Sequence, residues 1–313
     1  MAVPTNTYQT YQTVGIREDL IDKVFNLSPT ETPLVAAIPR VKATQTKHEW
    51  LTDTLAAPAT NAQIEGDDAS ADAITPAVRL NNYTQISRKV AQVSGTDTAV
   101  KGAANVNTMQ YALLKKSKEL KKDMEFALFA NQSSAAGSAA VARNLAGIPA
   151  WLSSNVDFGA TGANPATPGT ARTDGTLRAI TEANVKTVLS DAFTNTARSP
   201  KLCFVSAPHK QLFSTFTGNV TRFVDVNSAK AKLQTAYEVY VSDFGEIKLV
   251  PDLQQRSRDI IFINPEFIAM AYLRAFEKVP LSKTGDSERI ALYAEYTLEM
   301  RNEAGHAAIY DAS

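Results

Sequence analysis

The chain has 313 residues, of which 44% are hydrophobic and 8% aromatic, and its 32 basic residues balance 32 acidic ones. This composition excludes a disordered chain, and the length fits one large domain or two intertwined domains. Zero formal net charge argues against a dedicated nucleic-acid binder and keeps repulsion between many packed copies small. No apolar run approaches the roughly 20 residues that span a bilayer, and the first residues do not form a signal peptide, so we expect a cytoplasmic protein with no membrane partner.

Residues 1–40 carry four prolines and are expected to form an extended arm. Within this arm, one short helix is expected over Asp19–Phe25. A terminus of this kind has little apolar core of its own, so it needs something to hold it in place.

The next segment predicts a two-stranded ribbon. Thr46–Thr52 and Val78–Val93 are rich in Trp, Tyr, Thr, Ile and Val, the residue types that suit extended strands. Between them lies a long, acidic, alanine-rich stretch that is broken by two prolines and a glycine, which predicts a solvated tip. An isolated ribbon is marginal in water, so it lies on its own domain or on a neighbouring subunit. The alternative is an ordinary surface hairpin with a mobile tip.

Asn107–Phe129 is the strongly helical segment of the first half. Its apolar residues at helical spacing form one stripe: Met109, Leu113, Leu120, Met124 and Leu128. Lys115, Lys118 and Lys122 lie off that stripe. They form either a solvated face or a face turned toward nucleic acid.

Residues 131–146 and 159–175 are small and polar, so we expect loops that are mobile or moulded by contacts. From Thr181 a compact α/β unit is expected, with a helix capped by Thr181 and a second helix over Pro208–Phe216. Strands are expected at Leu202–Val205, Tyr237–Ser242, Ile247–Pro251, Ile260–Ile263, Phe267–Phe276, Arg289–Arg301 and His306–Tyr310. This order of elements suggests an α+β chain in which one domain is inserted within another.

Residues suited to catalysis are few. The chain has three histidines without zinc-ligand spacing and one cysteine, Cys203, in an apolar run that indicates a buried strand. Neither a phosphate-binding loop nor a nucleophile elbow occurs in the sequence. Asp67 and Asp68 sit together on the expected tip, where they would be weak metal ligands. We therefore expect a protein that is not an enzyme and has no catalytic site, cofactor or metal.

Several segments together resemble one known family. They are H-E-W-L-T-D-T-L and N-A-Q-I-E-G-D-D-A of the ribbon, K-K-S-K-E-L-K-K-D-M-E of the helix, and L-S-K-T-G-D-S-E-R and Y-T-L-E-M-R-N-E-A-G-H near the end. In this order they are similar to a major capsid protein of tailed bacteriophages with the Hong Kong 97-type fold. The resemblance covers nearly the whole chain.

The resemblance implies an α+β capsid fold in four parts. These are an N-terminal arm (1–40), an extended β-hairpin loop (41–93), a peripheral domain (94–175 and 264–313) with a spine helix over 107–129, and an inserted axial α/β domain (176–263). The implied contacts between subunits are candidates only: Trp50, Ile64, Glu65, Asp67, Asp68 and Tyr83. The candidate residues facing the lumen and DNA are Lys115, Lys118 and Lys122.

The implied function is structural. The chain would self-assemble in the host cytoplasm into hexamers and pentamers of an icosahedral virion head that encloses double-stranded DNA without sequence specificity. Any scaffold, portal or decoration protein would be a separate chain. One alternative is an encapsulin-like compartment, which shares the fold but holds an enzyme cargo. A more distant alternative is an enzyme with an unrecognised site.

Overall fold

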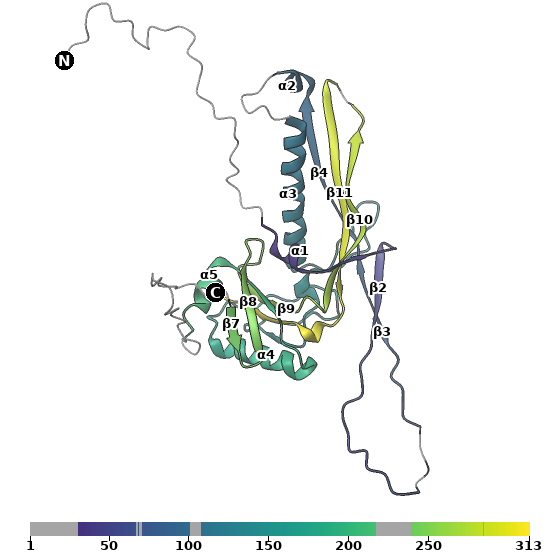
Figure 1. Cartoon of the computed structure of the whole chain (residues 1–313), viewed down its shortest axis with the longest axis vertical. Coiled ribbons are helices and arrows are strands. Elements are labelled where there is room, and N and C mark those ends of the chain that lie inside the picture. Colours follow the sequence, from purple (N-terminus) through teal and green to yellow (C-terminus); the bar gives the residue numbers. More distant parts are fainter. Residues whose placement is uncertain (1–30, 67, 69–70, 101–107, 217–238, 284) are drawn as a thin grey trace, which may run out of the picture.

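The computed structural model describes residues 31–66, 68, 71–100, 108–216, 239–283 and 285–313. The helix expected over Asp19–Phe25, Asp67 and the first residue of the helix expected from Asn107 lie outside these residues. The described residues form two sheets, a two-stranded ribbon and several helices. Figure 1 shows an elongated molecule with a tall sheet-and-helix part, a rounder part beside its foot, and a ribbon that projects away from both.

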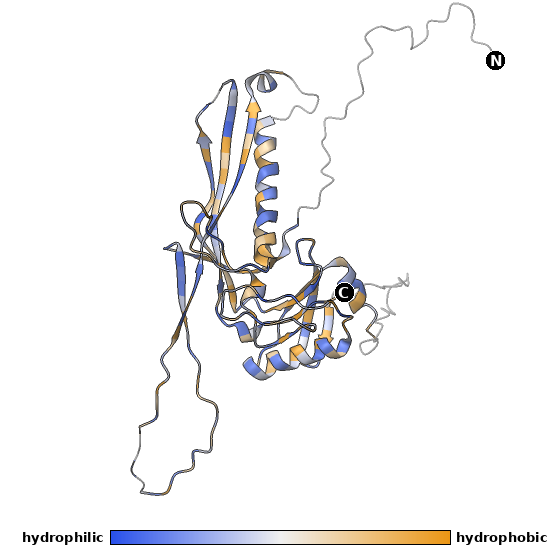
Figure 2. Ribbon diagram, turned by 180° about the vertical axis from the view of Figure 1, so that it is seen from behind, coloured by the Kyte–Doolittle hydropathy of each residue, from blue (hydrophilic) through white to orange (hydrophobic). Residues whose placement is uncertain are grey.

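The tall part is a four-stranded sheet covered on one face by a long helix. Its strands, in spatial order, are β1 (Arg40–Lys42), β10 (Ile268–Leu281), β11 (Ser287–Met300) and β4 (Gln85–Ser94). Helix α3 (Thr108–Phe129) lies lengthwise along this sheet (Figure 1), and α2 (Gly95–Ala99) follows β4 at the far end. Leu120, Met124 and Leu128 are fully buried between helix and sheet, which confirms the apolar stripe. Figure 2 shows the matching alternation of apolar and polar residues along α3.

The rounder part is built on a six-stranded sheet. In spatial order its strands are β5 (Val156–Asp157), β12 (Ala307–Tyr310), β9 (Asp259–Ile263), β6 (Leu202–Val205), β8 (Gly245–Pro251) and β7 (Val239–Ser242). Helices α4 (Glu182–Thr196) and α5 (Ala207–Phe213) pack against it. The apolar side chains between these helices and the sheet form one core, and the buried residues of α3 belong to another. The backbone N–H of Thr181 donates to the side chain of Asn184 over 2.9 Å, which confirms the expected helix start.

The last strand joins the rounder part. The family resemblance implied that residues 264–313 lie in the peripheral domain with the spine helix. Within this segment β12 pairs with β9 in the six-stranded sheet. All residues of β9 and β12 are buried. Apart from Asp259, which pairs with Arg256, both strands are short apolar runs that need cover on both faces. The C-terminal segment therefore contributes strands to both sheets.

The expected strand Val78–Val93 is in fact two strands, and that prediction is corrected. Strand β3 (Val78–Tyr83) pairs antiparallel with β2 (Lys47–Thr52), whereas β4 pairs with β11. The break falls at Thr84, whose buried hydroxyl donates to Glu295 over 2.9 Å. Hydrogen bonds from a buried polar residue hold the chain where it leaves one sheet and enters the other, a feature that strand propensity does not reveal.

Three short helices complete the described elements: α1 (Pro33–Ala37), η2 (Ile148–Ala150) and η3 (Glu303–Gly305). The sequence did not predict α1, which lies within the predicted N-terminal arm, or β1, which begins at the last residue of that arm. Leu34 and Val35 of α1 are buried in the core beneath α3, and β1 pairs in parallel with β10. The last ten residues of the predicted arm are therefore fixed on the body of the same chain.

Candidate functional surfaces

The base of the β2–β3 ribbon is fastened to the body of its own chain. The imidazole Nε2 of His48 lies 2.8 Å from Glu299 Oε2, and the indole N–H of Trp50 donates to the carbonyl of Met300 over 2.8 Å. The rings of Trp50 and Trp151 lie 5.4 Å apart between centroids. The hydrogen bond from His48 lowers the pKa of Glu299 despite the burial of its carboxyl group. These contacts fix the direction in which the ribbon leaves the body.

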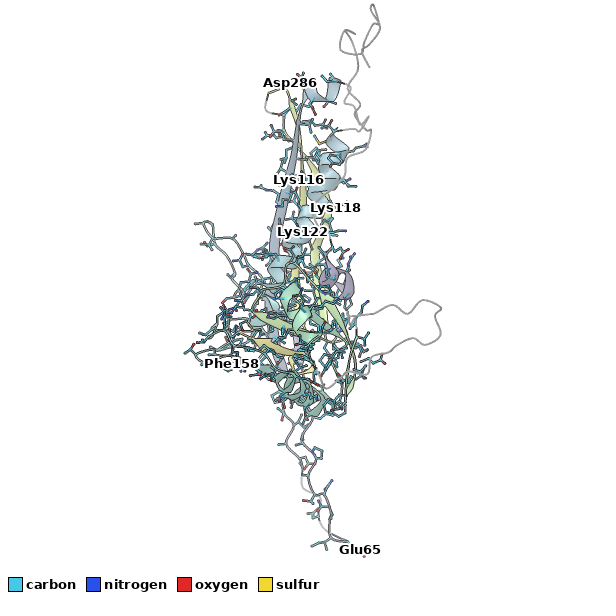
Figure 3. All side chains as sticks on the ribbon, turned by 90° about the vertical axis from the view of Figure 1, so that its left-hand side faces the viewer. Glu65, Lys116, Lys118, Lys122, Phe158 and Asp286 are labelled. Atoms are coloured by element: carbon cyan, nitrogen blue, oxygen red, sulfur yellow. The ribbon has the colours of Figure 1, made fainter. Side chains whose placement is uncertain are left out.

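Beyond this base, every described residue from 53 to 79 is exposed. Three large apolar side chains have almost no cover: Leu55 is 98% exposed, Ile64 80% and Ile74 94%. Glu65 lies at the far end of the projection (Figure 3), beside Gly66, whose φ of 86° suits glycine in a turn. A segment of this length without internal burial needs another surface to become ordered.

The six candidate contact residues of the ribbon fall into two groups. Ile64, Glu65 and Asp68 are exposed at the tip, whereas Trp50 and Tyr83 are half-buried at the base. Asp67 lies outside the described residues. Trp50 already contacts Met300 and Trp151 of its own chain. A contact between the tip and a neighbouring subunit would therefore leave these contacts at the base of the ribbon in place.

The outer face of α3 carries the three predicted lysines. Lys115 and Lys118 are exposed and Lys122 is half-buried. By helical spacing all three lie on the side of α3 away from its buried stripe, and Figure 3 labels Lys118 and Lys122 along the helix. The neighbouring Lys116 pairs with Glu119 over 2.8 Å. Tyr111, Leu114 and Phe126 are also exposed along α3, so its uncovered surface is both basic and apolar.

The loop over residues 159–175 is moulded around the carboxylate of Asp311. The backbone N–H groups of Gly159 and Gly175 donate to it over 3.1 and 3.0 Å, and the guanidinium groups of Arg172 and Arg258 over 3.0 and 2.7 Å. Burial favours the neutral form of Asp311, but Arg172, Gly175 and Arg258 outweigh it and lower its pKa. Sequence spacing gave no sign of this cluster, because its members are up to 152 residues apart.

The cysteine and two of the histidines are buried in the rounder part of the molecule. Burial raises the pKa of the Cys203 thiol, and it lowers that of His306 to about 4. Ser206 Oγ lies 3.0 Å from Nδ1 of His209 at the start of α5, where the serine is the N-cap residue. Each of these groups is enclosed in a core rather than presented to a substrate.

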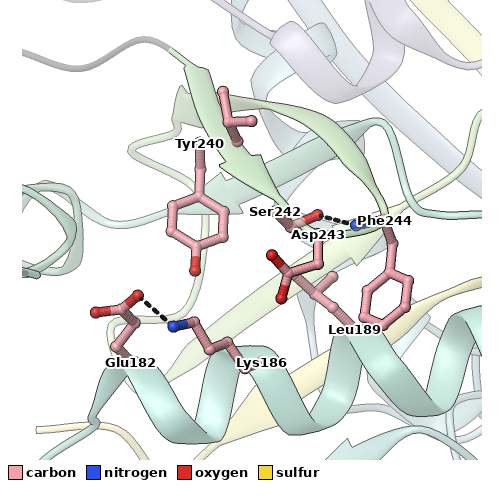
Figure 4. A pocket seen from close by; sticks show the side chains of 8 residues that line it. Glu182, Lys186, Leu189, Tyr240, Ser242, Asp243 and Phe244 are labelled. Carbon is pink, nitrogen blue, oxygen red and sulfur yellow. Dashed lines mark hydrogen bonds and ion pairs between the residues drawn. The ribbon is translucent and has the colours of Figure 1, made fainter. Parts of the chain in front are cut away.

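A small pocket of about 90 Å³ lies between α4 and the β7–β8 hairpin (Figure 4). Glu182 and Lys186 pair across 2.9 Å at its edge, and burial raises the pKa of Tyr240 beside them. In the described ranges, no cluster of three or more metal-binding side chains occurs. Among those same residues, no helix is long and apolar enough to cross a membrane.

Comparison with known proteins gives a consistent result. Residues 3–313 match the family model of the SU10 major capsid protein. The major capsid protein of Escherichia phage Phieco32 is 35% identical over 134 residues, which cover 42% of this chain and 38% of that relative. The alignment thus spans well under half of the curated relative.

Solved structures show the same fold. A Cyanophage A-1(L) capsid protein aligns with a TM-score of 0.64 at 14% identity, covering 97% of this chain and 98% of that one. A phage G chain, from a structure of major capsid and decoration proteins, aligns at 0.55 and 13% over all of both chains. An encapsulin of Synechococcus elongatus aligns at 0.56 and 9%, covering 95% of this chain and 93% of its own.

The fold is therefore the Hong Kong 97-type fold that the sequence resemblance implied. Because the family model spans nearly the whole chain, this protein belongs to the SU10 major capsid protein family.

Proposed function

We propose that this chain is the structural subunit of an icosahedral phage head, assembled from hexamers and pentamers in the host cytoplasm and closed around double-stranded DNA. The observation that carries the proposal is that every described residue between 53 and 79 is exposed. The Leu55, Ile64 and Ile74 side chains contribute about 1.5–3 kcal/mol each when an apolar surface buries them. Repeated at every subunit boundary, this gain favours a closed shell over separate chains.

In this proposal the tip is the part that reaches the neighbouring subunit. Ile64 supplies apolar contact, while Glu65, Asp67 and Asp68 supply polar contacts around it. Trp50 anchors the base of the ribbon within its own chain and so sets the direction of its reach, and Tyr83 is a further contact with the neighbouring subunit. A rigid base suits this task because every copy must meet its neighbour at a similar angle.

The division into parts follows from the same proposal. Residues 1–40 are the N-terminal arm and 41–93 the extended loop; 94–175 and 264–313 form the peripheral domain around α3, and 176–263 the axial domain. Strand β12 of the peripheral segment completes the axial sheet, which ties the two domains together. Scaffold, portal and decoration proteins, where used, are separate chains.

The outer face of α3 is proposed to face the packaged DNA. Lys115, Lys118 and Lys122 offer contacts with phosphates that are weak, salt-dependent and independent of sequence. To test this, all three are changed to Gln, and the DNA mass per purified head is measured. Heads that form normally but hold less DNA, or lose it at lower salt, support the proposal.

The matched control changes three exposed lysines elsewhere, Lys42, Lys248 and Lys283, to Gln, which removes the same charge. Unchanged packaging in the α3 variant, or an equal loss in the control, contradicts the role of the α3 face.

The second candidate is an encapsulin-like compartment, favoured by the structural likeness to the Synechococcus elongatus encapsulin. The two functions differ in what the shell holds. Purified particles from the native source are opened, and their nucleic acid and protein contents are compared. Double-stranded DNA supports the phage head, whereas an enclosed enzyme without DNA supports the compartment.

A further inference from the structure

The base of the ribbon is attached to β11 at two separate places. The ribbon leaves the tall part near its lower end (Figure 1), where β2 and β3 both lie against β11. At the first place, two side chains of β2 contact residues 299 and 300, where β11 ends. At the second, the hydroxyl of Thr84, just after β3, donates to Oε1 of Glu295 over 2.9 Å. Five residues of an extended strand span about 17 Å, so the two attachments lie well apart.

Asn82 adds contacts between these two places. Its side chain has no solvent exposure, and Nδ2 donates to the carbonyl oxygen of Leu298 over 2.9 Å and to that of Ala146 over 3.4 Å. Its Oδ1 accepts the backbone N–H of Ala146 over 2.9 Å. The N–H of Thr84 donates to the carbonyl oxygen of Thr46 over 2.8 Å, which joins the two sides of the ribbon at the same level. The second attachment therefore holds the β3 side of the ribbon, whereas the first holds the β2 side.

The carboxylate of Glu295 is itself held firmly. Glu295 is 3% exposed, and both of its oxygens accept a guanidinium group: Arg143 donates to Oε1 over 2.6 Å and Arg274 to Oε2 over 2.9 Å. Arg274 lies between two shifts in the pairing register of β10 and β11. Hydrogen bonds between charged groups are the strong ones, so the acceptor that meets Thr84 keeps a fixed orientation.

We propose that the contact between Thr84 and Glu295 is the second fixing point of the ribbon, and that these two are positioning residues that hold the ribbon at one angle to the tall sheet. The contacts at residues 299 and 300 by themselves secure one end of the base and leave the strand pair free to pivot about it. A second attachment further along the same strand stops that rotation. The consequence for the shell rests on the proposed function: a constant angle lets every tip meet its neighbour at the same place, so particles close at one size.

Thr297 provides a matched comparison for Thr84. It lies on the same face of β11 as Glu295, two residues further along, and has no solvent exposure. Its hydroxyl has no hydrogen-bond partner among the described residues. Thr297→Val therefore removes a buried hydroxyl close to the same place without removing a contact. Thr84→Val removes the hydroxyl that bonds to Glu295, and Thr84→Ser keeps it.

The angle of the ribbon is measured on the unassembled full-length chain by pulsed electron paramagnetic resonance. Spin labels are attached at Val78→Cys, at the end of β3 far from Thr84, and at Lys118→Cys on α3, both of which are exposed positions. The native Cys203 is fully buried and stays unlabelled. The distribution of distances between the labels should be narrow in the otherwise unchanged chain, in Thr84→Ser and in Thr297→Val, and clearly broader in Thr84→Val. Should Thr84→Val fail to fold, Thr84→Ala and Thr297→Ala carry the same comparison.

Distributions of equal width with and without the Thr84 hydroxyl would overturn the proposal, and so would equal broadening in Thr297→Val. The effect on the shell is measured without labels, as the spread of particle diameters in electron micrographs. Thr84→Val should widen this spread, whereas Thr84→Ser and Thr297→Val should match the wild type; uniform normal particles from Thr84→Val would contradict the link to the shell. If the wild type itself formed no shells, the proposed function would fail, while the label distances would still decide the role of Thr84 and Glu295.

Discussion

The indole of Trp50 donates a hydrogen bond to the main-chain oxygen of Met300, 2.8 Å away, at the point where β11 ends. This bond joins residues 250 positions apart and anchors the ribbon on the sheet that carries α3. The ribbon therefore combines a fixed base with a tip that has no cover in its own chain.

Changing Trp50 to Ala should destabilise the chain by about 1.5–3 kcal/mol, because it removes a large, half-buried ring packed against Trp151. Trp50→Phe keeps most of the packing and loses the bond to Met300, so it should cost less, about 0.5–1.5 kcal/mol for the bond itself. Chemical denaturation of the unassembled chain measures both. Equal stability of wild type and Trp50→Ala would show that the base is not anchored as described.

Asp311→Asn should destabilise the chain by about 3–5 kcal/mol, because it removes the fully buried carboxylate partner of the Arg172 guanidinium and leaves only the partly exposed Asp174. The pKa of Asp311 is lowered in the folded state, so its contribution is present above the ordinary value of 3.8 and is lost as pH falls through the folded value. The difference in unfolding free energy between variant and wild type should therefore be full at neutral pH and shrink in strong acid. A difference that does not change with pH contradicts an ionised Asp311.

Gly159→Ala tests the close wrapping of the loop around Asp311. A Cβ at residue 159 would overlap the carbonyl oxygen of Thr176, so the loop has to shift and its bond to Asp311 weakens. Gly66→Ala is the comparison, because a Cβ there meets no atom within 4 Å and the cost is conformational, about 1–2 kcal/mol at most. Thermal unfolding should place Gly159→Ala well below Gly66→Ala; the reverse order would contradict the packing of this loop.

Much of the fold was predictable where local pattern and packing agree. The stripe of α3 and the apolar run Leu202–Val205 lie in the structure almost where the sequence placed them. The break at Thr84 and the pairing of β12 with β9 were not predictable, because both depend on partners far along the chain. An extended run looks the same in sequence whichever sheet receives it.

For the functional surfaces, the sequence predicted which residues are exposed but not which polar residues are buried. Local composition predicts that the tip around Ile64 and the lysines of α3 are exposed. In the structure Ile64, Lys115 and Lys118 are indeed exposed. The spacing of Lys121 and Glu125 suits a surface ion pair, but Glu125 is buried beneath α1. Its hydrogen-bond partners, the N–H groups of Leu34 and Val35, are 91 and 90 positions away, so these contacts become visible only in the folded chain.

Point substitutions at the tip should separate assembly from folding. Replacing Leu55, Ile64 and Ile74 with Ser should leave the unfolding free energy of the single chain nearly unchanged, because these side chains have almost no cover. Assembly into particles, followed by light scattering, should be strongly reduced. Leu253→Ser, at a residue that is also exposed but away from the ribbon, should assemble normally. Normal assembly of the triple variant would count against apolar contact by the tip.

Deletion of residues 56–73 tests the central claim most directly. The base of the ribbon stays anchored through Trp50, so we expect a folded chain with the circular dichroism and thermal unfolding of the wild type. Electron microscopy of that chain, expressed with its native partners, should show no closed shells. Normal heads from the deletion variant would contradict the role of the ribbon as the contact between subunits.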